Sequence, residues 1–237
     1  MKLVFEFTKT GNLVFISHLD LMRLFLRVLR MSGLRPAYSH GFNPHPKMSI
    51  AMPLSLGLHS TCELLEFETD EVNSAEEAAA AVDTANMKLP EGVRVTAWCR
   101  KPDYLTKSLA SFVAAATYEY MCDGVMDATE KLAGFLSRDS VIVRKPDKKS
   151  GKESDQEIRA DILESRNIKD MRGCILAEAT LRAAPGKTLG PLVFWNAFCG
   201  SSGLDPDELS PAITRTAILD AKGKPVKAML PVMVKVK

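Results

Sequence analysis

Along the first hundred residues, segments with the apolar spacing of a β-strand alternate with segments that have the apolar spacing of an α-helix. This alternation limits the fold more than any other feature. Several short segments alternate apolar and polar residues, as half-buried strands do. Strands are expected at 2–7, 14–16, 34–39, 48–58, 62–69 and 93–99. Two apolar helical runs start with capping-box patterns at Ser17 and Ser74 and end near Gly33 and before Pro90. This order predicts an α+β, ferredoxin-like (βαββαβ) unit with its helices on one sheet face.

The same order of elements is expected again in the second half of the chain. Strands are expected at 112–121, 141–143, 157–163, 174–183 and 213–219. A capping box at Asp127 and Glu130 predicts one helix, and residues 189–199, with Pro191 in the first turn, predict another. The polar segment 145–155 is expected to be a charged hairpin or a mobile loop.

These patterns predict two ferredoxin-like units that pack together. The N-terminal unit is expected at 1–100 and carries the motifs SHLDLMR and GFNPHPK. Residues 101–109 have the composition of a linker, and the second unit is expected at 110–237.

Composition favours a cytoplasmic protein without membrane contact. Hydrophobic residues make up 46% of the chain, but no apolar run has the roughly 18 residues that a membrane helix needs. The five cysteines form no C-x-x-C pair, which favours buried thiols over a disulfide framework or a zinc site. The net charge is only +2, so a nucleic acid would have to be held by a local basic patch.

The first motif places charged residues along one edge of an otherwise apolar helix. His18 is expected at the first helical position, where free backbone N–H groups favour an anion. Asp20, Arg23, Arg27 and Arg30 fall within roughly 80° of one another on a helical wheel. This edge is either a solvated stripe with an Asp20–Arg23 ion pair or a track that follows phosphate groups.

The second motif, YSHGFNPHPK (38–47), is a loop stiffened by two prolines. Stiffening lowers the entropy cost of holding Asn43, His45 and Lys47 in one arrangement, which favours recognition of a ligand. Tyr38 and Phe42 are expected either to stack on a base or to fill a core.

All four histidines lie in the first quarter of the chain. His40 and His59 are expected to be structural or merely exposed. The spacing from His40 to His45 has no acidic or cysteine companion, so no metal site is expected. His18 and His45 are candidates for general acid–base cleavage of RNA without a metal.

Three stretches carry a family resemblance: FISHLDLMRLFLRVLRMSGL (15–34), YSHGFNPHPKMSIAMPLSLGL (38–58) and CELLEFE (62–68). They resemble the radical SAM-linked protein family, a domain of unknown function found fused behind a radical SAM enzyme or as a separate chain. RTAIL (215–219) is similar to the family's C-terminal end. The resemblance implies that the chain works with a radical SAM enzyme. A likeness in fold alone is to CRISPR repeat-processing endoribonucleases, which also pair two ferredoxin-like units.

The chain lacks the C-x-x-x-C-x-x-C motif that would hold an iron–sulfur cluster. The cluster and S-adenosylmethionine are therefore expected only in the partner enzyme, and this chain is expected to carry no cofactor. The leading hypothesis is a non-catalytic accessory that binds or presents a substrate, with RNA as that substrate. Contacts to the substrate are expected from Arg23, Arg27, Tyr38, Phe42, Asn43, His45 and Lys47.

Two alternatives remain open. One is a metal-independent ribonuclease or RNA-modifying enzyme that uses His18 or His45. The other is a protein-binding adaptor without RNA contact. The leading hypothesis also expects the loop 38–47 and the basic helix edge to line one cleft.

Overall fold

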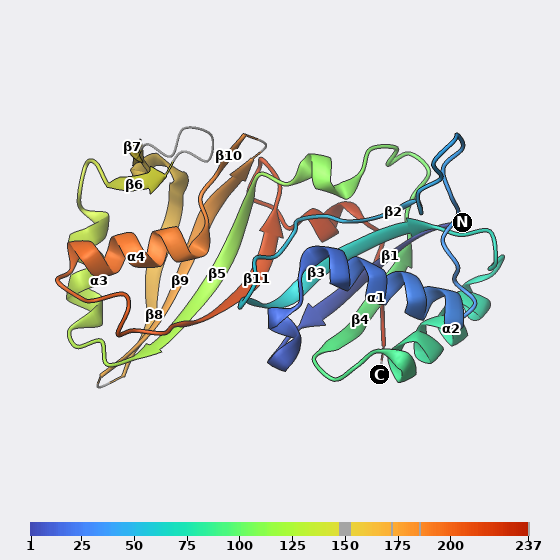
Figure 1. Cartoon of the computed structure of the whole chain (residues 1–237), viewed down its shortest axis with the longest axis horizontal. Helices are drawn as coiled ribbons and strands as arrows, with labels where there is room; N and C mark the ends of the chain where they lie inside the picture. The colour runs from blue at the N-terminus through green and yellow to red at the C-terminus, as the bar shows by residue number, and fades with distance from the viewer. Residues whose placement is uncertain (147–152, 172, 185, 237) are drawn as a thin grey trace. The chain divides into compact units, whose positions relative to one another are not determined.

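The computed structural model describes residues 1–146, 153–171, 173–184 and 186–236, which form an α+β fold (Figure 1). The chain divides into two compact units. Unit 1 contains Met1–Val113 and the C-terminal stretch that begins at Ala217, and unit 2 contains Ala114–Thr216. The α+β class expected from the sequence is confirmed, whereas the expected linker at 101–109 stays a prediction.

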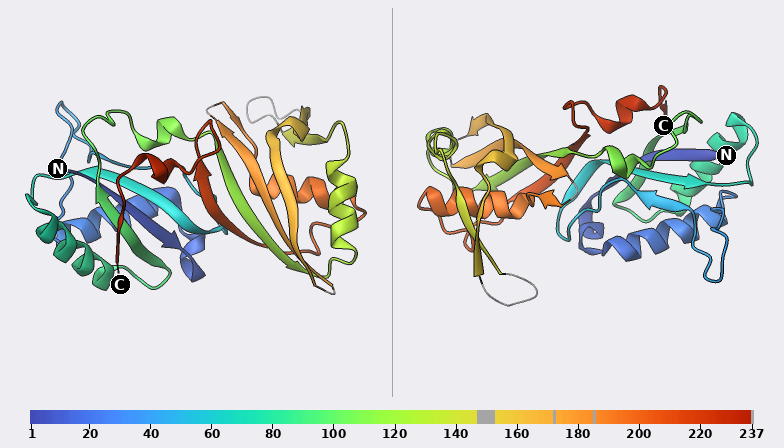
Figure 2. Two further views of the ribbon diagram at one scale, coloured as in Figure 1. Left: turned by 180° about the vertical axis from the view of Figure 1, so that it is seen from behind. Right: turned by 90° about the horizontal axis from the view of Figure 1, so that it is seen from above.

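Unit 1 contains an antiparallel sheet with the strand order β2-β3-β1-β4-β12. Its strands are β1 (Lys2–Lys9), β2 (Met48–Ile50), β3 (His59–Glu68), β4 (Val93–Arg100) and β12 (Val234–Lys235). Its α-helices are α1 (His18–Met31) and α2 (Ala75–Lys88), and its 3-10 helices are η1 (Gly11–Phe15), η2 (Leu109–Phe112) and η4 (Val226–Met229). Seen from above, α1 lies on one face of the sheet and η4 on the other (Figure 2).

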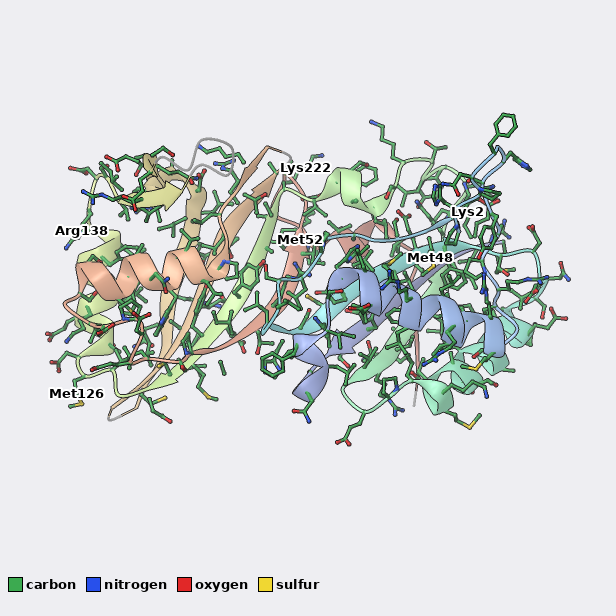
Figure 3. All side chains as sticks on the ribbon, in the orientation of Figure 1. Lys2, Met48, Met52, Met126, Arg138 and Lys222 are labelled. Carbon is green, nitrogen blue, oxygen red and sulfur yellow. The ribbon has the colours of Figure 1, made fainter. Side chains whose placement is uncertain are left out.

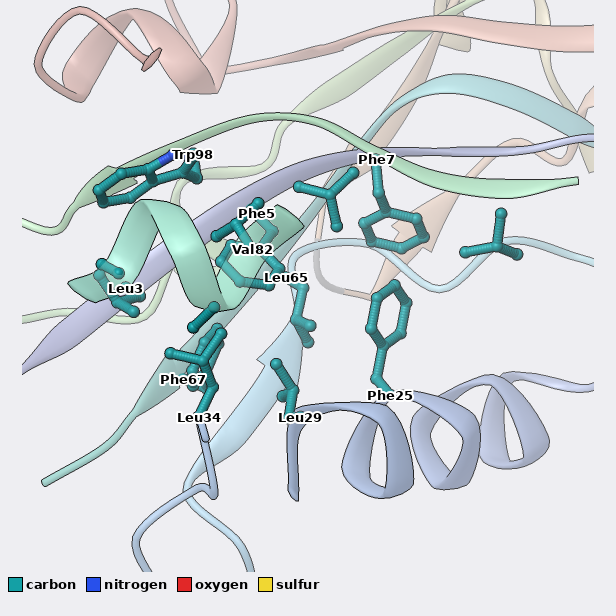
Figure 4. Packing of buried hydrophobic residues seen from close by; sticks show 14 of the residues in the cluster. Leu3, Phe5, Phe7, Phe25, Leu29, Leu34, Leu65, Phe67, Val82 and Trp98 are labelled. Atoms are coloured by element: carbon teal, nitrogen blue, oxygen red, sulfur yellow. The ribbon is translucent and has the colours of Figure 1, made fainter. Parts of the chain in front are cut away.

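The core of unit 1 lies between the sheet and its two α-helices. The ring of Phe7 on β1 lies 4.7 Å from that of Phe25 on α1, and Phe5 packs edge-on against Phe67 at 5.0 Å (Figure 4). Successive residues of a strand point to opposite faces of the sheet. Since Phe67 faces the helices, its neighbour Glu66 on β3 faces away from them.

Unit 2 contains a sheet with the order β8-β9-β5-β11, and β10 pairs with β9. The strands are β5 (Ala115–Asp123), β8 (Ile162–Met171), β9 (Cys174–Ala184), β10 (Lys187–Thr188) and β11 (Ala212–Leu219), of which β11 belongs to unit 2 as far as Thr216. A separate hairpin is formed by β6 (Ile142–Pro146) and β7 (Glu153–Glu157), and the helices are α3 (Ala128–Leu136), η3 (Arg159–Asp161) and α4 (Pro191–Ser201). The core contains a cluster of aromatic rings, namely Tyr120, Phe135, Phe194, Trp195 and Phe198.

The helix starts at Ser17 and Ser74 are confirmed. Each serine Oγ accepts a hydrogen bond from the backbone amide three residues on, as an N-cap does. The capping box at Asp127 is wrong, although α3 does begin directly after it. Asp127 has a positive φ of 53° and makes no side-chain capping bond.

Three strand predictions in the first sixty residues are wrong in whole or in part. Residues 14–16 end a 3-10 helix, and the buried ammonium of Lys9 donates to the carbonyls of Val14 and Ile16 at 3.2 and 3.0 Å. Residues 34–39 form only isolated bridges, because Pro36 has no N–H for a ladder. Residues 48–58 form a strand only at β2.

Other local predictions agree with the structure. The five cysteines are buried and free, as expected. Residues 147–152 of the charged segment 145–155 lie outside the described residues, while its flanks belong to the β6–β7 hairpin. None of the helices in the described ranges has the length and apolar character needed to cross a bilayer.

Candidate functional site

The loop 38–47 is held in a fixed shape by bonds across its base. The Ser39 amide donates to the His45 carbonyl at 2.8 Å, and the His45 amide donates back to the Ser39 hydroxyl at 3.0 Å. Below this pair, the Lys47 amide donates to the Ala37 carbonyl at 2.8 Å. The stiffness expected from the prolines is therefore reinforced by hydrogen bonds at the point where the loop leaves the sheet.

The side chains at the tip of this loop face solvent. Phe42 is fully exposed, with a relative accessibility of 112%, and Asn43 and His45 are exposed as well. Gly41 has a φ of 126°, a value that L side chains rarely adopt, and it allows the chain to turn into the tip. Phe42 therefore does not fill a core, and its stacking on a base stays a prediction.

Tyr38 connects the loop to the C-terminal end of α1. Its hydroxyl accepts a hydrogen bond from Nη2 of Arg30, and the Arg30 guanidinium lies 5.9 Å from the centroid of the ring. This position is within the range of a cation–π contact. Tyr38 thus joins the two sequence motifs, but its ring already has a partner.

The other arginines of the helix edge lie apart from the loop contact. Arg23 forms an ion pair with Asp20 at 3.0 Å, and the two side chains are 77% and 55% exposed. The pKa of Asp20 is lowered by hydrogen bonds from Ser17 and Arg23. Arg27 is exposed and has no ion-pair partner among the described residues. The solvated-stripe alternative therefore fits Arg23, while Arg27 stays available to a ligand.

Behind the loop, unit 1 has a pocket of about 380 Å³, which we call the Lys2 pocket. Its lining comes from β1, β2, β3, the loop 38–47 and the segment after β4. The lining residues are Lys2, Ser39, His45, Pro46, Lys47, Met48, Ser49, Glu66, Phe67, Glu68, Lys101, Thr106 and Ser108. Figure 3 labels Lys2 and Met48 near the end of the sheet where the loop leaves it. The pocket brings His45 and Lys47 together, and its lining contains neither Arg23 nor Arg27.

A buried carboxylate forms one wall of the Lys2 pocket. Oε2 of Glu66 accepts a hydrogen bond from the Lys101 ammonium at 2.5 Å, and these side chains are 11% and 5% exposed. Oε1 accepts from the Ser49 hydroxyl at 3.1 Å, the Leu109 amide at 3.0 Å and the Ser108 hydroxyl. Both oxygens of this carboxylate are therefore engaged, with three donors on Oε1 and the ammonium on Oε2, which suits a structural role rather than that of a free base.

The pKa of Glu66 reflects two opposing effects. Burial alone raises it, because the charged form loses water. Hydrogen bonds from Lys101 and Ser108, the positive charge of Lys101 and the Leu109 amide outweigh burial and hold the pKa below its ordinary value. Glu66 is thus ionised at neutral pH, and it fixes the segment 101–109 against β3.

The charges that remain in the Lys2 pocket favour an anion. Glu68 is paired with Lys47 at 3.3 Å, in a contact that leaves about a third of each side chain exposed. Lys2 is exposed and forms no ion pair within the ranges that the structure describes. Three lysines against two glutamates leave one net positive charge in the lining.

His18 and His45 lie near opposite ends of α1. His18 is the first residue of the helix, whereas the loop with His45 contacts Arg30 near the last turn. Twelve residues of α-helix span about 18 Å. The structure therefore places His18 at the start of α1 and attaches the loop that carries His45 near its last turn, so no contact observed among the described residues joins the two imidazoles.

The sequence predicted His45 and Lys47 at this site but missed Glu66, Lys101 and Ser108. Lys101 and Ser108 stand in the segment interpreted as a linker, and nothing local distinguishes them from solvated residues. Glu66 interrupts the apolar strand CELLEFE, and such a charge within an apolar strand was a signal that could have found it. Within the described ranges, no three His, Cys, Asp or Glu side chains gather to hold a metal ion.

Comparison with known proteins gives a family and a fold. Residues 2–191 match a family described as "Uncharacterized protein conserved in bacteria (DUF2344)". No curated protein matches the sequence. Among solved structures, the chain is similar to one in the "Crystal Structure of a Cbf5-Nop10-Gar1 Complex", with a TM-score of 0.52 and 9% identity. That similarity covers 91% of this chain but only 48% of the other, and at this identity it concerns the fold alone.

Proposed function

The chain belongs to the bacterial family DUF2344, and from the geometry of its loop we propose that it is an accessory of a radical SAM enzyme that binds or presents RNA as the substrate. One observation carries the RNA part of this proposal. A loop fixed at its base exposes an aromatic ring, an amide and an imidazole next to Lys47 and the Tyr38–Arg30 contact. Such a surface suits a single-stranded nucleic acid, which offers flat bases and phosphates together.

The exposed side chains have distinct roles in this proposal. Phe42 stacks on one base, a contact worth about 1–3 kcal/mol. Asn43 hydrogen-bonds to a base edge, and Lys47 and His45 contact the backbone on one side of the loop. Arg27 extends the phosphate contacts along α1. Because the loop is already ordered, binding requires little loss of conformational entropy.

The partner supplies the chemistry in this proposal. The radical SAM enzyme holds the iron–sulfur cluster and S-adenosylmethionine, and this chain, which has no C-x-x-x-C-x-x-C motif, acts in the cytoplasm without a cofactor of its own. The motifs SHLDLMR and GFNPHPK support the partnership by their resemblance to radical SAM-linked proteins. Co-purification with the radical SAM enzyme of the same organism tests this part separately from RNA binding.

We also propose that both units are ferredoxin-like. Such a unit has the order βαββαβ and places its first and third strands at the centre of the sheet. The order β4-β1-β3-β2 in unit 1 supports this assignment. In unit 2 the order β11-β5-β9-β8 supports it too, if the β6–β7 hairpin is counted as an insertion after α3.

The RNA proposal is tested by fluorescence anisotropy with labelled single-stranded RNA over a salt series. The slope of log K against log salt should be about −0.7 for each phosphate contact. Arg27→Gln and Lys47→Gln should each reduce the slope by about one contact, while Lys88→Gln, an exposed lysine at the end of α2, should leave it unchanged. Binding that is absent, or that does not depend on salt, refutes the proposal.

Base stacking needs its own control. Phe42→Ala should weaken RNA binding by about five- to a hundredfold, which corresponds to the loss of one stacked base. Tyr104→Ala, which removes a ring that is 79% exposed elsewhere in unit 1, should have no effect. If Phe42→Ala binds RNA like the wild type, stacking on Phe42 is refuted. If no RNA binds at all while the radical SAM partner still co-purifies, the chain is an adaptor without RNA contact. If the purified chain cleaves RNA and His45→Ala abolishes cleavage, it is the enzyme.

A further inference from the structure

The Lys2 pocket contains two kinds of polar group, those already engaged and those still available. Glu66 and Lys101 are engaged with each other, and Lys101 also donates to the Lys107 carbonyl at 2.8 Å. The ammonium of Lys2 and the imidazole of His45 have no hydrogen-bond partner among the described residues. The groups left to a ligand are therefore the ammonium of Lys2 and the imidazole of His45.

Lys47 adds a third group that a ligand could recruit. Its ammonium lies 3.3 Å from Glu68, and the two side chains are 38% and 32% exposed. An ion pair this exposed contributes little to stability, so a dianion in the pocket could draw Lys47 away at little cost. Lys2 and Glu68 are direct neighbours on β1 and β3, which places both lysines at the same end of the sheet.

The size and apolar lining of the Lys2 pocket indicate a ligand larger than a lone anion. A volume of about 380 Å³ lies within the range of small-molecule sites and far exceeds one phosphate group. Pro46 and Met48 are half-buried in the lining and offer apolar surface beside the amines. The ligand should thus combine a negative group with a flat or apolar body.

We propose that the Lys2 pocket holds one nucleoside phosphate, whose phosphate lies on Lys2, His45 and Lys47 and whose base or sugar lies against Pro46 and Met48. This inference rests on the proposed function, since in RNA the bound nucleotide would neighbour the base stacked on Phe42. The same chemistry is offered by a free mononucleotide and by one nucleotide of a strand. In this proposal the pocket binds one nucleotide at a defined position, whereas Phe42 at the loop tip stacks on a base of any identity.

Isothermal titration calorimetry with the four nucleoside monophosphates, the matching nucleosides and inorganic phosphate tests the pocket directly. A monophosphate should bind at least tenfold more tightly than its nucleoside and than phosphate alone. Lys2→Gln should weaken monophosphate binding about ten- to a hundredfold, as expected for one lost charged hydrogen bond. Lys88→Gln removes the same charge from an exposed residue outside the pocket, and it should leave monophosphate binding unchanged.

The outcomes separate the pocket from the proposed function. Monophosphate binding that depends on Lys2, together with weaker RNA binding by Lys2→Gln, supports the pocket as a subsite for RNA. Monophosphate binding that depends on Lys2, without any RNA binding, supports a pocket for free nucleotides and refutes the RNA function. RNA binding that requires Phe42 but is unaffected by Lys2→Gln, with no monophosphate bound, refutes the pocket and leaves the function standing. Equal weakening by Lys2→Gln and Lys88→Gln also refutes the pocket.

Discussion

Removal of the Lys101 ammonium should destabilise unit 1 strongly. In Lys101→Met the Glu66 carboxylate keeps its negative charge in a buried site, where its side chain is only 11% exposed. Loss of one partner of a buried ion pair costs about 3–5 kcal/mol. The remaining donors, Ser49, Ser108 and the Leu109 amide, still compensate part of the charge. We therefore expect a loss of about 3 kcal/mol, a large part of the stability of a typical domain.

The two tryptophans allow this loss to be measured in unit 1 alone. Trp98 lies on β4 in unit 1 and Trp195 on α4 in unit 2, and both are buried. In a Trp195→Phe background, urea unfolding followed by fluorescence reports only Trp98. The double variant Glu66→Gln/Lys101→Met removes both charges and should recover most of the loss, since no unpaired charge remains.

The pH dependence provides an independent check. The folded-state pKa of Glu66 lies below its unfolded value, so its stabilisation is present above the unfolded pKa and is lost as the pH falls through the folded pKa. In Lys101→Met, burial should dominate and raise the folded pKa. The difference in stability between wild type and variant should then shrink as the pH is lowered from 7 towards 4. A loss below about 1 kcal/mol at pH 7, or one that does not change with pH, would refute this reasoning.

Three further predictions concern the scaffold. Gly92→Ala should destabilise unit 1 by about 2 kcal/mol or more, because Gly92 has a φ of +96° and an added Cβ would lie 2.4 Å from the Thr10 carbonyl oxygen; urea unfolding measures this. Gly134→Ala in α3 should stabilise unit 2 by about 0.5–1 kcal/mol, because a Cβ there meets nothing within 4 Å; thermal unfolding followed at Trp195 measures this. Burial raises the pKa of Cys99 and Cys199 to about 11, so a thiol reagent at pH 8 should modify them slowly in the folded chain and rapidly in urea.

Much of the fold could be predicted because its signals are local. Ser17 and Ser74 start helices through bonds to residues three positions away, and those bonds are visible in sequence as a pattern. The strand expected at 14–16 failed because of a contact that the apolar pattern does not encode. Its carbonyls accept from the buried ammonium of Lys9, which allows a 3-10 turn at a position where apolar β-branched residues suggest a strand. The capping box at Asp127 failed because the backbone there turns with a positive φ.

The candidate site was less accessible to prediction, because its parts come from distant segments. His45 and Lys47 were found through an unusual loop composition. One wall of the Lys2 pocket, however, depends on the ion pair between Glu66 and Lys101. Lys101 lies 35 positions away, in a segment that resembles a linker.

This difference bears on how the site works. The loop residues that the sequence marks as unusual, Phe42, Asn43 and His45, are exposed to solvent and do not serve packing. The residues that hold this loop in place, Glu66 and Lys101, are common charged residues. Their structural role follows from their burial, which the sequence does not show. The hydroxyls of Ser49 and Ser108 both donate to Oε1 of Glu66. The same carboxylate therefore holds both β2 and the segment after β4. The base of the loop that carries His45 and Lys47 continues directly into β2. Under the proposal for the Lys2 pocket, a change at Glu66 should therefore weaken the binding of a nucleoside monophosphate even though Lys2, His45 and Lys47 are retained, and calorimetric titration measures this.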